Sequence, residues 1–216
     1  MNPTRTLRPA LVLLAIFTMV CGLLYPLAVT SAANVFAKQR QGSLVVAANG
    51  QIVGSKLVGQ SFTKPGHFWG RPSATSPAPY DAGSSSGSNL GPSNPALRDA
   101  IRERVQALKA ADPEQAGEVP VDLVSASGSG LDPDISPAAA YYQVHRVAIA
   151  RGLDESKVRA LVDANVEGRF LGIFGEPHVS ALLLNQALDA LAGGASAVVL
   201  EGAASARHET SASAAE

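Results

Sequence analysis

With 216 residues and a net charge of −1, the chain is long enough for one ordinary domain with additional segments, but not for two full domains. Its balanced charge and the absence of a lysine- or arginine-rich run exclude a typical nucleic-acid-binding surface, so no nucleic-acid partner is expected. Cys21 is the only cysteine, which excludes an intramolecular disulfide.

The N-terminal stretch is predicted to cross a membrane. It contains no charged residue from Pro9 to Ala37, and about 20 apolar residues in a helix span the hydrocarbon core of a bilayer. A signal peptide cleaved near Ser31–Ala33 and a lipid anchor at Cys21 are the alternatives. The apolar run is longer than that of a typical signal peptide, and residues 18–20 lack the leucine and small residue expected before a lipid-modified cysteine. We therefore expect an uncleaved single span.

The flanking charges do not decide the orientation of this span, because Arg5 and Arg8 precede it and Lys38 and Arg40 follow it. The short basic tail favours a cytoplasmic N-terminus and an extracytoplasmic soluble part. We expect an α+β soluble domain anchored by one N-terminal transmembrane helix. The expected boundaries are a cytoplasmic tail at 1–8, the transmembrane helix at 9–37, the soluble domain at 38–192 and a disordered tail rich in Ala, Gly and Ser at 193–216.

The soluble part begins with a predicted hairpin at 43–58, where Asn49-Gly50 suits a tight turn. The loop that follows, 59–95, is rich in Ser, Gly and Pro but retains aromatic residues, which indicates an ordered, functional loop. A short strand is expected at 119–124. Helices are predicted after three capping residues: from Asn94 to about Ala111, from Ser136 to Gly152, and after Asp154, with a last apolar segment, 179–191, helical at its end.

Two motifs could indicate a catalytic or an anion-binding site. Residues 83–87 read G-x-S-x-G, the pattern of a hydrolase nucleophile, but the strand before it and the helix after it that such a motif needs are not predicted. The glycine-rich turn from Ser127 to Pro133 precedes a helix and could expose backbone N–H groups to an anion, although it lacks the phosphate-loop pattern. A nucleotide site and a tight structural turn both remain open there. The histidines match no zinc pattern, so no metal site is expected.

Four segments, in this order and after a single span, resemble the C subunit of the Kdp potassium-transporting ATPase. They are Gly59-Gln60-Ser61-Phe62, Phe68-Trp69-Gly70-Arg71-Pro72-Ser73, Gly87 to Pro95, and Ser125 to Ser136, followed by Gln143-Val144 and Arg146-Val147-Ala148. The resemblance covers the chain from the membrane span to about Leu191. It implies a bacterial P-type pump in the inner membrane, built from a channel-like potassium-binding subunit, a catalytic subunit, this subunit and a small membrane peptide.

The resemblance implies a non-catalytic accessory role in high-affinity potassium uptake, with ATP and potassium handled by the complex and no cofactor of its own. One implied role is that of a catalytic chaperone that raises the ATP affinity of the catalytic subunit. The nucleotide-binding residues would then be Ser127, Gly128, Ser129, Gly130, Asp132 and Gln143. From the sequence, Gln143 lies at the edge of an apolar helical stripe, where it could reach a ligand or cap a surface.

An extracytoplasmic domain would be separated from cytosolic ATP by the bilayer, which favours a role in assembly, stability and coupling. Aromatic residues and Arg dominate the cores of protein interfaces. We therefore expect the long loop to contact partner subunits. Membrane lipid is a further expected partner of the anchored chain. The candidate contact residues are Phe62, Phe68, Trp69, Arg71, Tyr80 and Asn89. The alternative from a different class is a membrane-anchored hydrolase with Ser86 or Ser129 as its nucleophile.

Overall fold

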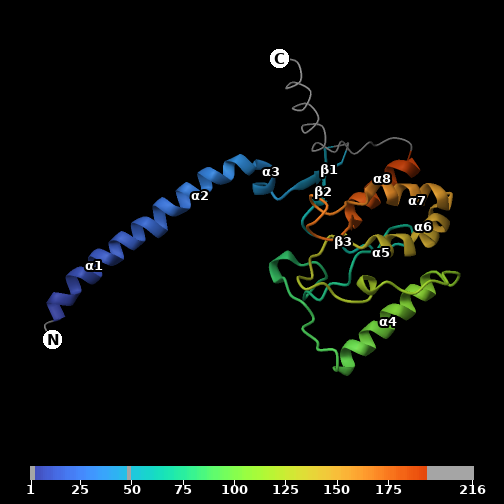
Figure 1. Cartoon of the computed structure of the whole chain (residues 1–216), viewed down its shortest axis with the longest axis horizontal. Helices are drawn as coiled ribbons and strands as arrows, with labels where there is room; N and C mark the ends of the chain where they lie inside the picture. Colours follow the sequence, from blue (N-terminus) through green and yellow to red (C-terminus); the bar gives the residue numbers. More distant parts are fainter. Residues whose placement is uncertain (1–2, 48–49, 194–216) are drawn as a thin grey trace, which may run out of the picture. The chain divides into compact units, whose positions relative to one another are not determined.

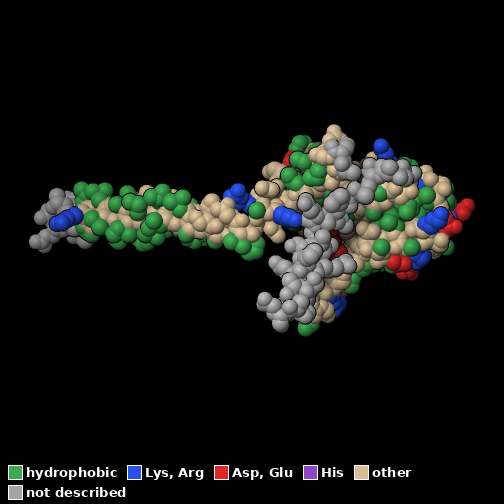
Figure 2. All heavy atoms as spheres, turned by 90° about the horizontal axis from the view of Figure 1, so that it is seen from above, with side chains coloured by type: hydrophobic (Ala, Val, Ile, Leu, Met, Phe, Trp, Pro, Cys, Tyr) green, Lys and Arg blue, Asp and Glu red, His purple; other side chains and the backbone are tan. Residues whose placement is uncertain are grey.

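The computed structural model describes residues 3–47 and 50–193, and the chain divides into two units, Met1–Ser43 and Leu44–Glu216 (Figure 1). Among its described residues, the first unit is helical from Pro3 to Arg40. Its elements are α1 (Pro3–Met19), a π-helical segment (Val20–Leu24), α2 (Tyr25–Ala33), a 3-10 segment (Asn34–Phe36) and α3 (Ala37–Arg40). Within the described residues, one helix, Leu7–Arg40, is long and apolar enough to cross a membrane. Figure 2 shows hydrophobic side chains along its length.

The second unit begins with the predicted hairpin. β1 (Leu44–Val46) pairs antiparallel with β2 (Ile52–Ser55), and the register shifts between Val45 and Val46. Val45 points into the domain, while its neighbours on β1 are exposed, as the alternation of side chains along a strand requires. Gly50, with φ of 81°, donates its N–H to the carbonyl of Ala47 at 2.9 Å. Asn49 lies outside the described residues, so the predicted Asn-Gly turn is described only at its glycine.

The three predicted capping residues are confirmed. Asn94 accepts a hydrogen bond from the Ala96 N–H at 2.9 Å and begins α4 (Pro95–Ala111). Ser136 accepts from the Ala139 N–H at 3.1 Å before α5 (Pro137–Tyr142), and Asp154 accepts from the Ser156 N–H at 2.8 Å before α7 (Glu155–Asn165). These helices begin where the sequence predicts because each cap satisfies an N–H group that the first helical turn leaves unpaired.

Two predictions about local structure are corrected. Residues 119–124 do not form a strand, since Val121–Leu123 is a 3-10 helix that begins directly after Pro120. The helix predicted from Ser136 to Gly152 is two helices, α5 and α6 (Val144–Arg151), divided at Gln143. Gly152 ends α6 as predicted, with φ of 63°, a conformation that favours glycine.

A second small sheet joins parts of the chain that are far apart in sequence. β3 (Asp134–Ile135) pairs antiparallel with β4 (Val179–Ser180), and α8 (Ala181–Gly193) follows β4 directly. The domain is therefore a mixture of helices and short strands, consistent with the expected α+β composition. The predicted tail at 193–216 lies outside the described residues, apart from Gly193.

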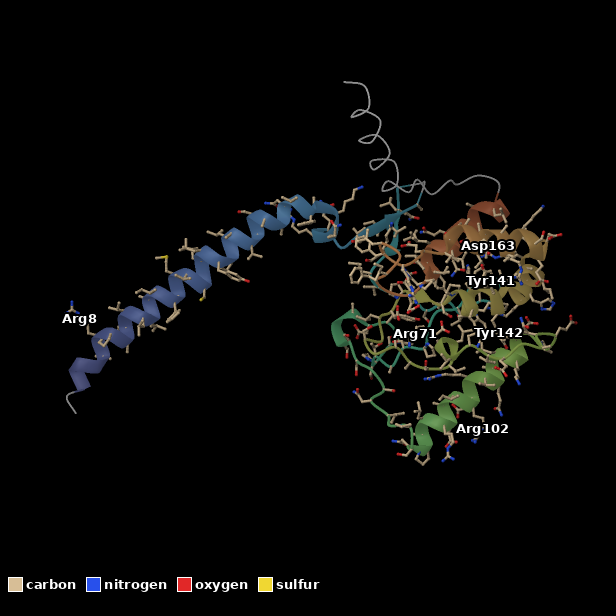
Figure 3. All side chains as sticks on the ribbon, in the orientation of Figure 1. Arg8, Arg71, Arg102, Tyr141, Tyr142 and Asp163 are labelled. Atoms are coloured by element: carbon tan, nitrogen blue, oxygen red, sulfur yellow. The ribbon has the colours of Figure 1, made fainter. Side chains whose placement is uncertain are left out.

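The core of the second unit is formed by helices α5 to α8, which lie together in Figure 1, with α4 packing on them through Leu108. Its fully buried side chains come from helices α5–α8, from strands β3 and β4, and from the long loop that precedes α4. They include Phe68, Ile135, Val144, Val147, Val158, Val162, Val179, Leu184 and Leu188. Tyr141 of α5 also donates a hydrogen bond to Asp163 of α7, and Figure 3 shows the two side chains close together. Phe68 and the partly buried Trp69 thus anchor the long loop, 59–95, in the core.

Candidate functional site

The long loop and the glycine-rich turn lie against each other and form what we call the loop–turn junction, residues 68–87 and 125–134. Five hydrogen bonds join them: the Ser85 hydroxyl donates to the carbonyl of Ser129, Arg71 donates to the Asp132 carboxylate, and three more involve the backbone of the turn or the loop. The Ser127 N–H donates to the carbonyl of Pro72 at 3.1 Å, the Ser86 N–H donates to the carbonyl of Ser129 at 3.0 Å, and the Ser73 hydroxyl donates to the carbonyl of Gly130 at 2.7 Å. The two segments that carry most of the family resemblance are therefore one structural unit.

Gly130 is at the tightest point of this junction. Its φ of 70° is rarely adopted by other residues, and a Cβ atom placed there would lie 2.6 Å from both the Ser86 carbonyl oxygen and the Thr75 methyl group. Gly128 differs, because a Cβ atom there would meet nothing within 4 Å. Of the two glycines in the predicted nucleotide turn, only Gly130 is required by the packing of the loop.

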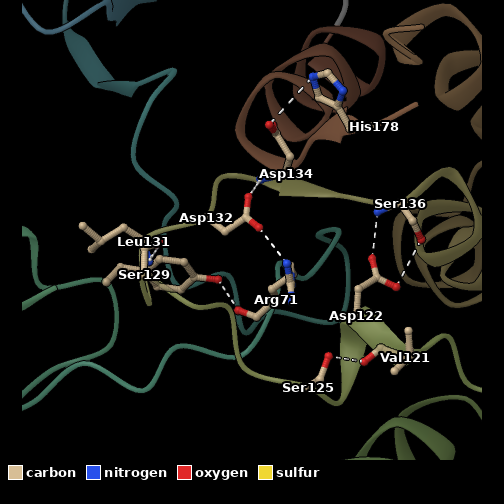
Figure 4. Close-up of polar contacts among 11 residues, drawn as sticks. Arg71, Val121, Asp122, Ser125, Ser129, Leu131, Asp132, Asp134, Ser136 and His178 are labelled. Carbon is tan, nitrogen blue, oxygen red and sulfur yellow. Dashed lines mark hydrogen bonds and ion pairs between the residues drawn. The ribbon is translucent and has the colours of Figure 1, made fainter. Parts of the chain in front are cut away.

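Asp132 connects the turn to the loop through an ion pair (Figure 4). Its Oδ2 atom lies 2.9 Å from Arg71 Nη1, and its Oδ1 atom accepts a hydrogen bond from the Asp134 N–H at 3.1 Å. The Tyr80 hydroxyl donates to the Arg71 carbonyl. Burial, followed by the nearby Asp132 carboxylate, raises the pKa of Tyr80 to about 12, so this hydroxyl keeps its proton and remains a donor.

Gln143, the last predicted nucleotide residue, is 1% exposed and lies inside the domain rather than at its surface. Its Oε1 atom accepts hydrogen bonds from the Trp69 N–H at 2.8 Å and from Arg146 Nη2 at 2.6 Å. Its Nε2 atom donates to the Trp69 carbonyl at 3.1 Å and to the Ala139 carbonyl at 3.2 Å. The amide thus pairs with the loop backbone as a neighbouring strand would.

Asn185 of α8 binds Phe68, the residue before Trp69 in the loop, in the same way. Its Oδ1 atom accepts from the Phe68 N–H at 2.7 Å, and its Nδ2 atom donates to the Phe68 carbonyl at 2.9 Å. We call Gln143 and Asn185 together the amide clamp. Asn185 was not predicted from the sequence, although an asparagine within the apolar stretch 179–191 is a recognisable signal of a buried polar contact.

The six predicted contact residues are not equivalent. Phe68 is 0% exposed and supports the loop from inside. Trp69 is partly buried beneath the Arg146 guanidinium, whose central carbon lies 4.0 Å from the ring centroid. The Phe62 ring packs against His67, and Arg71 and Tyr80 are partly buried in the junction, whereas Asn89 is exposed. A contact of these residues with a partner remains a prediction.

The two serines proposed as hydrolase nucleophiles make only backbone hydrogen bonds in the described part of the chain. The Ser86 hydroxyl donates to the Gly87 carbonyl at 3.2 Å, and the Ser129 hydroxyl accepts from the Leu131 N–H at 3.1 Å. A serine nucleophile requires a base within hydrogen-bond reach, and no histidine or carboxylate hydrogen-bonds to either hydroxyl in this part of the chain. The hydrolase alternative is therefore not supported. Over residues 3–47 and 50–193, no cluster of His, Cys, Asp and Glu suited to a metal ion is found.

Comparison with known proteins gives consistent matches. Residues 7–190 match the family described as K+-transporting ATPase, c chain. A protein of Sorangium cellulosum named potassium-transporting ATPase KdpC subunit is 61% identical over 184 residues, which cover 85% of this chain and 96% of that protein. A subunit of the same name from Variovorax paradoxus is 60% identical over 187 residues, covering 86% of this chain and 96% of its own length. The chain therefore belongs to the family of the K+-transporting ATPase c chain.

Proposed function

We propose that this chain is the accessory subunit of an ATP-driven, high-affinity potassium uptake complex in a bacterial inner membrane. The observation that carries the proposal is the match of residues 7–190 to the family, together with relatives that are named as subunits of a potassium-transporting ATPase. Its partners are the other subunits of that complex: a channel-like potassium-binding subunit, a catalytic P-type subunit and a small membrane peptide. ATP and potassium are handled by these partners.

A non-catalytic role agrees with the sequence. The Asp-Lys-Thr-Gly-Thr phosphorylation motif of a P-type catalytic subunit does not occur in it. One candidate span in the described residues also does not provide the several helices that surround a potassium filter. We propose that the chain supports assembly, stability and coupling of the complex.

The contacts of the loop–turn junction support this role over direct binding of ATP. Gln143 Oε1 and Nε2 are both engaged by the loop backbone, and the carbonyls of Ser129 and Gly130 accept hydrogen bonds from the loop. A nucleotide that used the Gln143 amide would have to displace the Trp69 backbone from it. The nucleotide-binding role implied for Ser127–Asp132 and Gln143 stays a prediction, which isothermal calorimetry of the detergent-solubilised full chain with ATP would check. Saturable binding at sub-millimolar affinity that is lost in Gln143→Ala would favour the chaperone role.

We further propose that Leu7–Arg40 anchors the chain in the membrane and that the domain lies on the extracytoplasmic side, which the short basic N-terminal tail supports. Single cysteines at Gln41 and Lys109 in a Cys21→Ser background are expected to react with a membrane-impermeant thiol reagent in intact spheroplasts. Protection of both positions until lysis would contradict this orientation.

The experiment that tests the function is co-purification. The full chain, tagged and expressed in cells that also produce a multi-span potassium-binding subunit and a P-type ATPase of the same operon, is expected to recover both in mild detergent. A tagged, unrelated single-span protein serves as the control. Membranes from cells without this chain are expected to lose potassium-stimulated ATPase activity. Full activity without it, together with no co-purification, would overturn the proposed function.

A further inference from the structure

A second loop of the domain carries apolar side chains on its outside. The segment between α7 and β4, residues 167–178, is called here the apolar finger, and in Figure 1 the orange chain between α7 and α8 contains it. Four large hydrophobic residues at its tip are each 63–73% exposed: Phe170, Leu171, Ile173 and Phe174. Soluble surfaces usually carry such residues singly, so four of them within five positions mark an interaction site.

The backbone of the finger holds these side chains in a fixed arrangement. Glu167 and His178 exchange two backbone hydrogen bonds at its base, at 2.8 and 3.0 Å, and Phe170 and Phe174 exchange two at its tip, also at 2.8 and 3.0 Å. Leu171 has a φ of 53°, a conformation that is unfavourable for a bulky residue. Strained backbone of this kind is found where the surrounding structure serves a functional contact. The apolar tip is therefore preorganised, which lowers the entropy lost on binding.

The charges around the finger distinguish two kinds of surface that could bind it. Arg169 is paired with Glu176 at 2.7 Å, and His178 Nε2 lies 3.8 Å from both the Asp134 and the Glu167 carboxylates. Loops that insert into anionic lipid surfaces combine apolar tips with unpaired Lys and Arg. Around the base of this finger lie instead three carboxylates, those of Asp134, Glu167 and Glu176, against one arginine, Arg169, which is paired with Glu176. A lipid surface is thus disfavoured, and a protein groove with basic or neutral donor groups at its rim is complementary.

We propose that the apolar finger docks into an apolar groove on a membrane-embedded subunit of the same complex, an inference that rests on the proposed function. The two phenylalanines and the neighbouring Leu171 and Ile173 fill the floor of the groove. Glu167 and Glu176 face polar or basic groups at its rim. Aromatic anchors in a desolvated pocket contribute most of the affinity of many interfaces, so a tip of four apolar side chains can hold the domain on its partner.

Site-specific photo-cross-linking identifies the molecule that the apolar finger contacts. A photoreactive phenylalanine analogue replaces Ile173 in the full chain, co-expressed with the other subunits, and the same analogue replaces Ile149 as a control of similar exposure, 66%, on α6. Illumination is expected to give an adduct between position 173 and a membrane-embedded subunit, and at least tenfold less from position 149. Adducts at position 173 with lipid alone, or equal adducts from both positions, would overturn the inference.

A matched pair of double variants gives an independent measurement. Phe170→Ser with Phe174→Ser is expected to lower recovery of the partner subunits at least threefold, while the melting temperature of the chain stays unchanged. Val121→Ser with Ile149→Ser removes hydrophobic residues of similar exposure elsewhere and is expected to leave recovery unchanged. Equal recovery by the finger variant and the wild type would contradict the finger contact alone. Failure of the wild-type chain to recover any subunit would instead contradict the proposed function.

Discussion

Two loops of this domain contain aromatic residues, and they use them in opposite ways. In the loop–turn junction, Phe68 is fully buried and the backbone beside it is bound by the amide clamp. In the apolar finger, Phe170 and Phe174 point outward on a backbone whose hydrogen bonds, among the described residues, lie within the finger itself. Aromatic content therefore shows that a loop is ordered, but it does not show whether the loop faces the core or a partner.

The sharpest test of this comparison is one substitution made in both loops. Phe68→Ala removes a fully buried ring and is expected to lower the free energy of unfolding by about 4 kcal/mol. Phe174→Ala removes an exposed ring and is expected to change it by less than about 0.5 kcal/mol. Urea titration of the full chain in detergent, followed by the fluorescence of Trp69, the only tryptophan, measures both. Similar losses in the two variants would mean that the finger also packs on the core.

A pair of glycines separates backbone strain from packing. Gly130 in the junction and Gly172 in the finger have φ values of 70° and 73°, so the backbone cost of an alanine, about 1–2 kcal/mol, is the same at both. A Cβ atom at Gly130 would also collide with Ser86 and Thr75, whereas one at Gly172 meets nothing within 4 Å. We expect Gly130→Ala to lower the free energy of unfolding by about 3 kcal/mol and Gly172→Ala by about 1 kcal/mol. Equal losses would show that the junction relaxes around the new methyl group.

The smallest difference in stability is expected when one polar contact is removed from each of the two loops. Gln143→Ala leaves the buried Trp69 N–H and carbonyl without their partner and is expected to cost about 2 kcal/mol of stability. Glu176→Ala removes only the exposed ion pair with Arg169, which is worth about 0.5 kcal/mol. The same urea titration reports both. A Gln143→Ala chain as stable as the wild type would argue that this amide is retained for a ligand and not for the loop.

The sequence predicted those elements that depend on neighbouring residues. Asn94, Ser136 and Asp154 were identified as helix caps because each acts on an N–H group two or three residues away. The hairpin at 43–58 was also predictable from local pattern. The pairing of β3 with β4 was not, since it joins segments about 45 residues apart and each strand has only two residues. The predicted strand at 119–124 was wrong, because a 3-10 helix begins there directly after Pro120.

In the candidate site, too, the features that depend on contacts between distant segments could not be predicted from the sequence. The family resemblance selected the loop and the turn, and the structure shows that they are in contact. It did not reveal that Gln143 is buried or that Asn185 completes the amide clamp, because burial depends on which helices pack together. The finger was overlooked because Phe170 to Phe174 has no motif, and an exposed apolar residue cannot be recognised from composition alone.

The π-helical turn at Val20–Leu24 affects the direction in which the side chains of the predicted membrane helix point. At this turn the Tyr25 N–H donates to the carbonyl of Val20, five residues earlier, so the turn contains one residue more than a turn of α-helix. Each residue of a helix advances by about 100° around the axis. A stripe of side chains that faces one neighbour along α1 is therefore turned by about 100° along α2. A straight neighbouring helix that follows one face of the span therefore contacts residues on α2 whose spacing is shifted by one position from the spacing on α1.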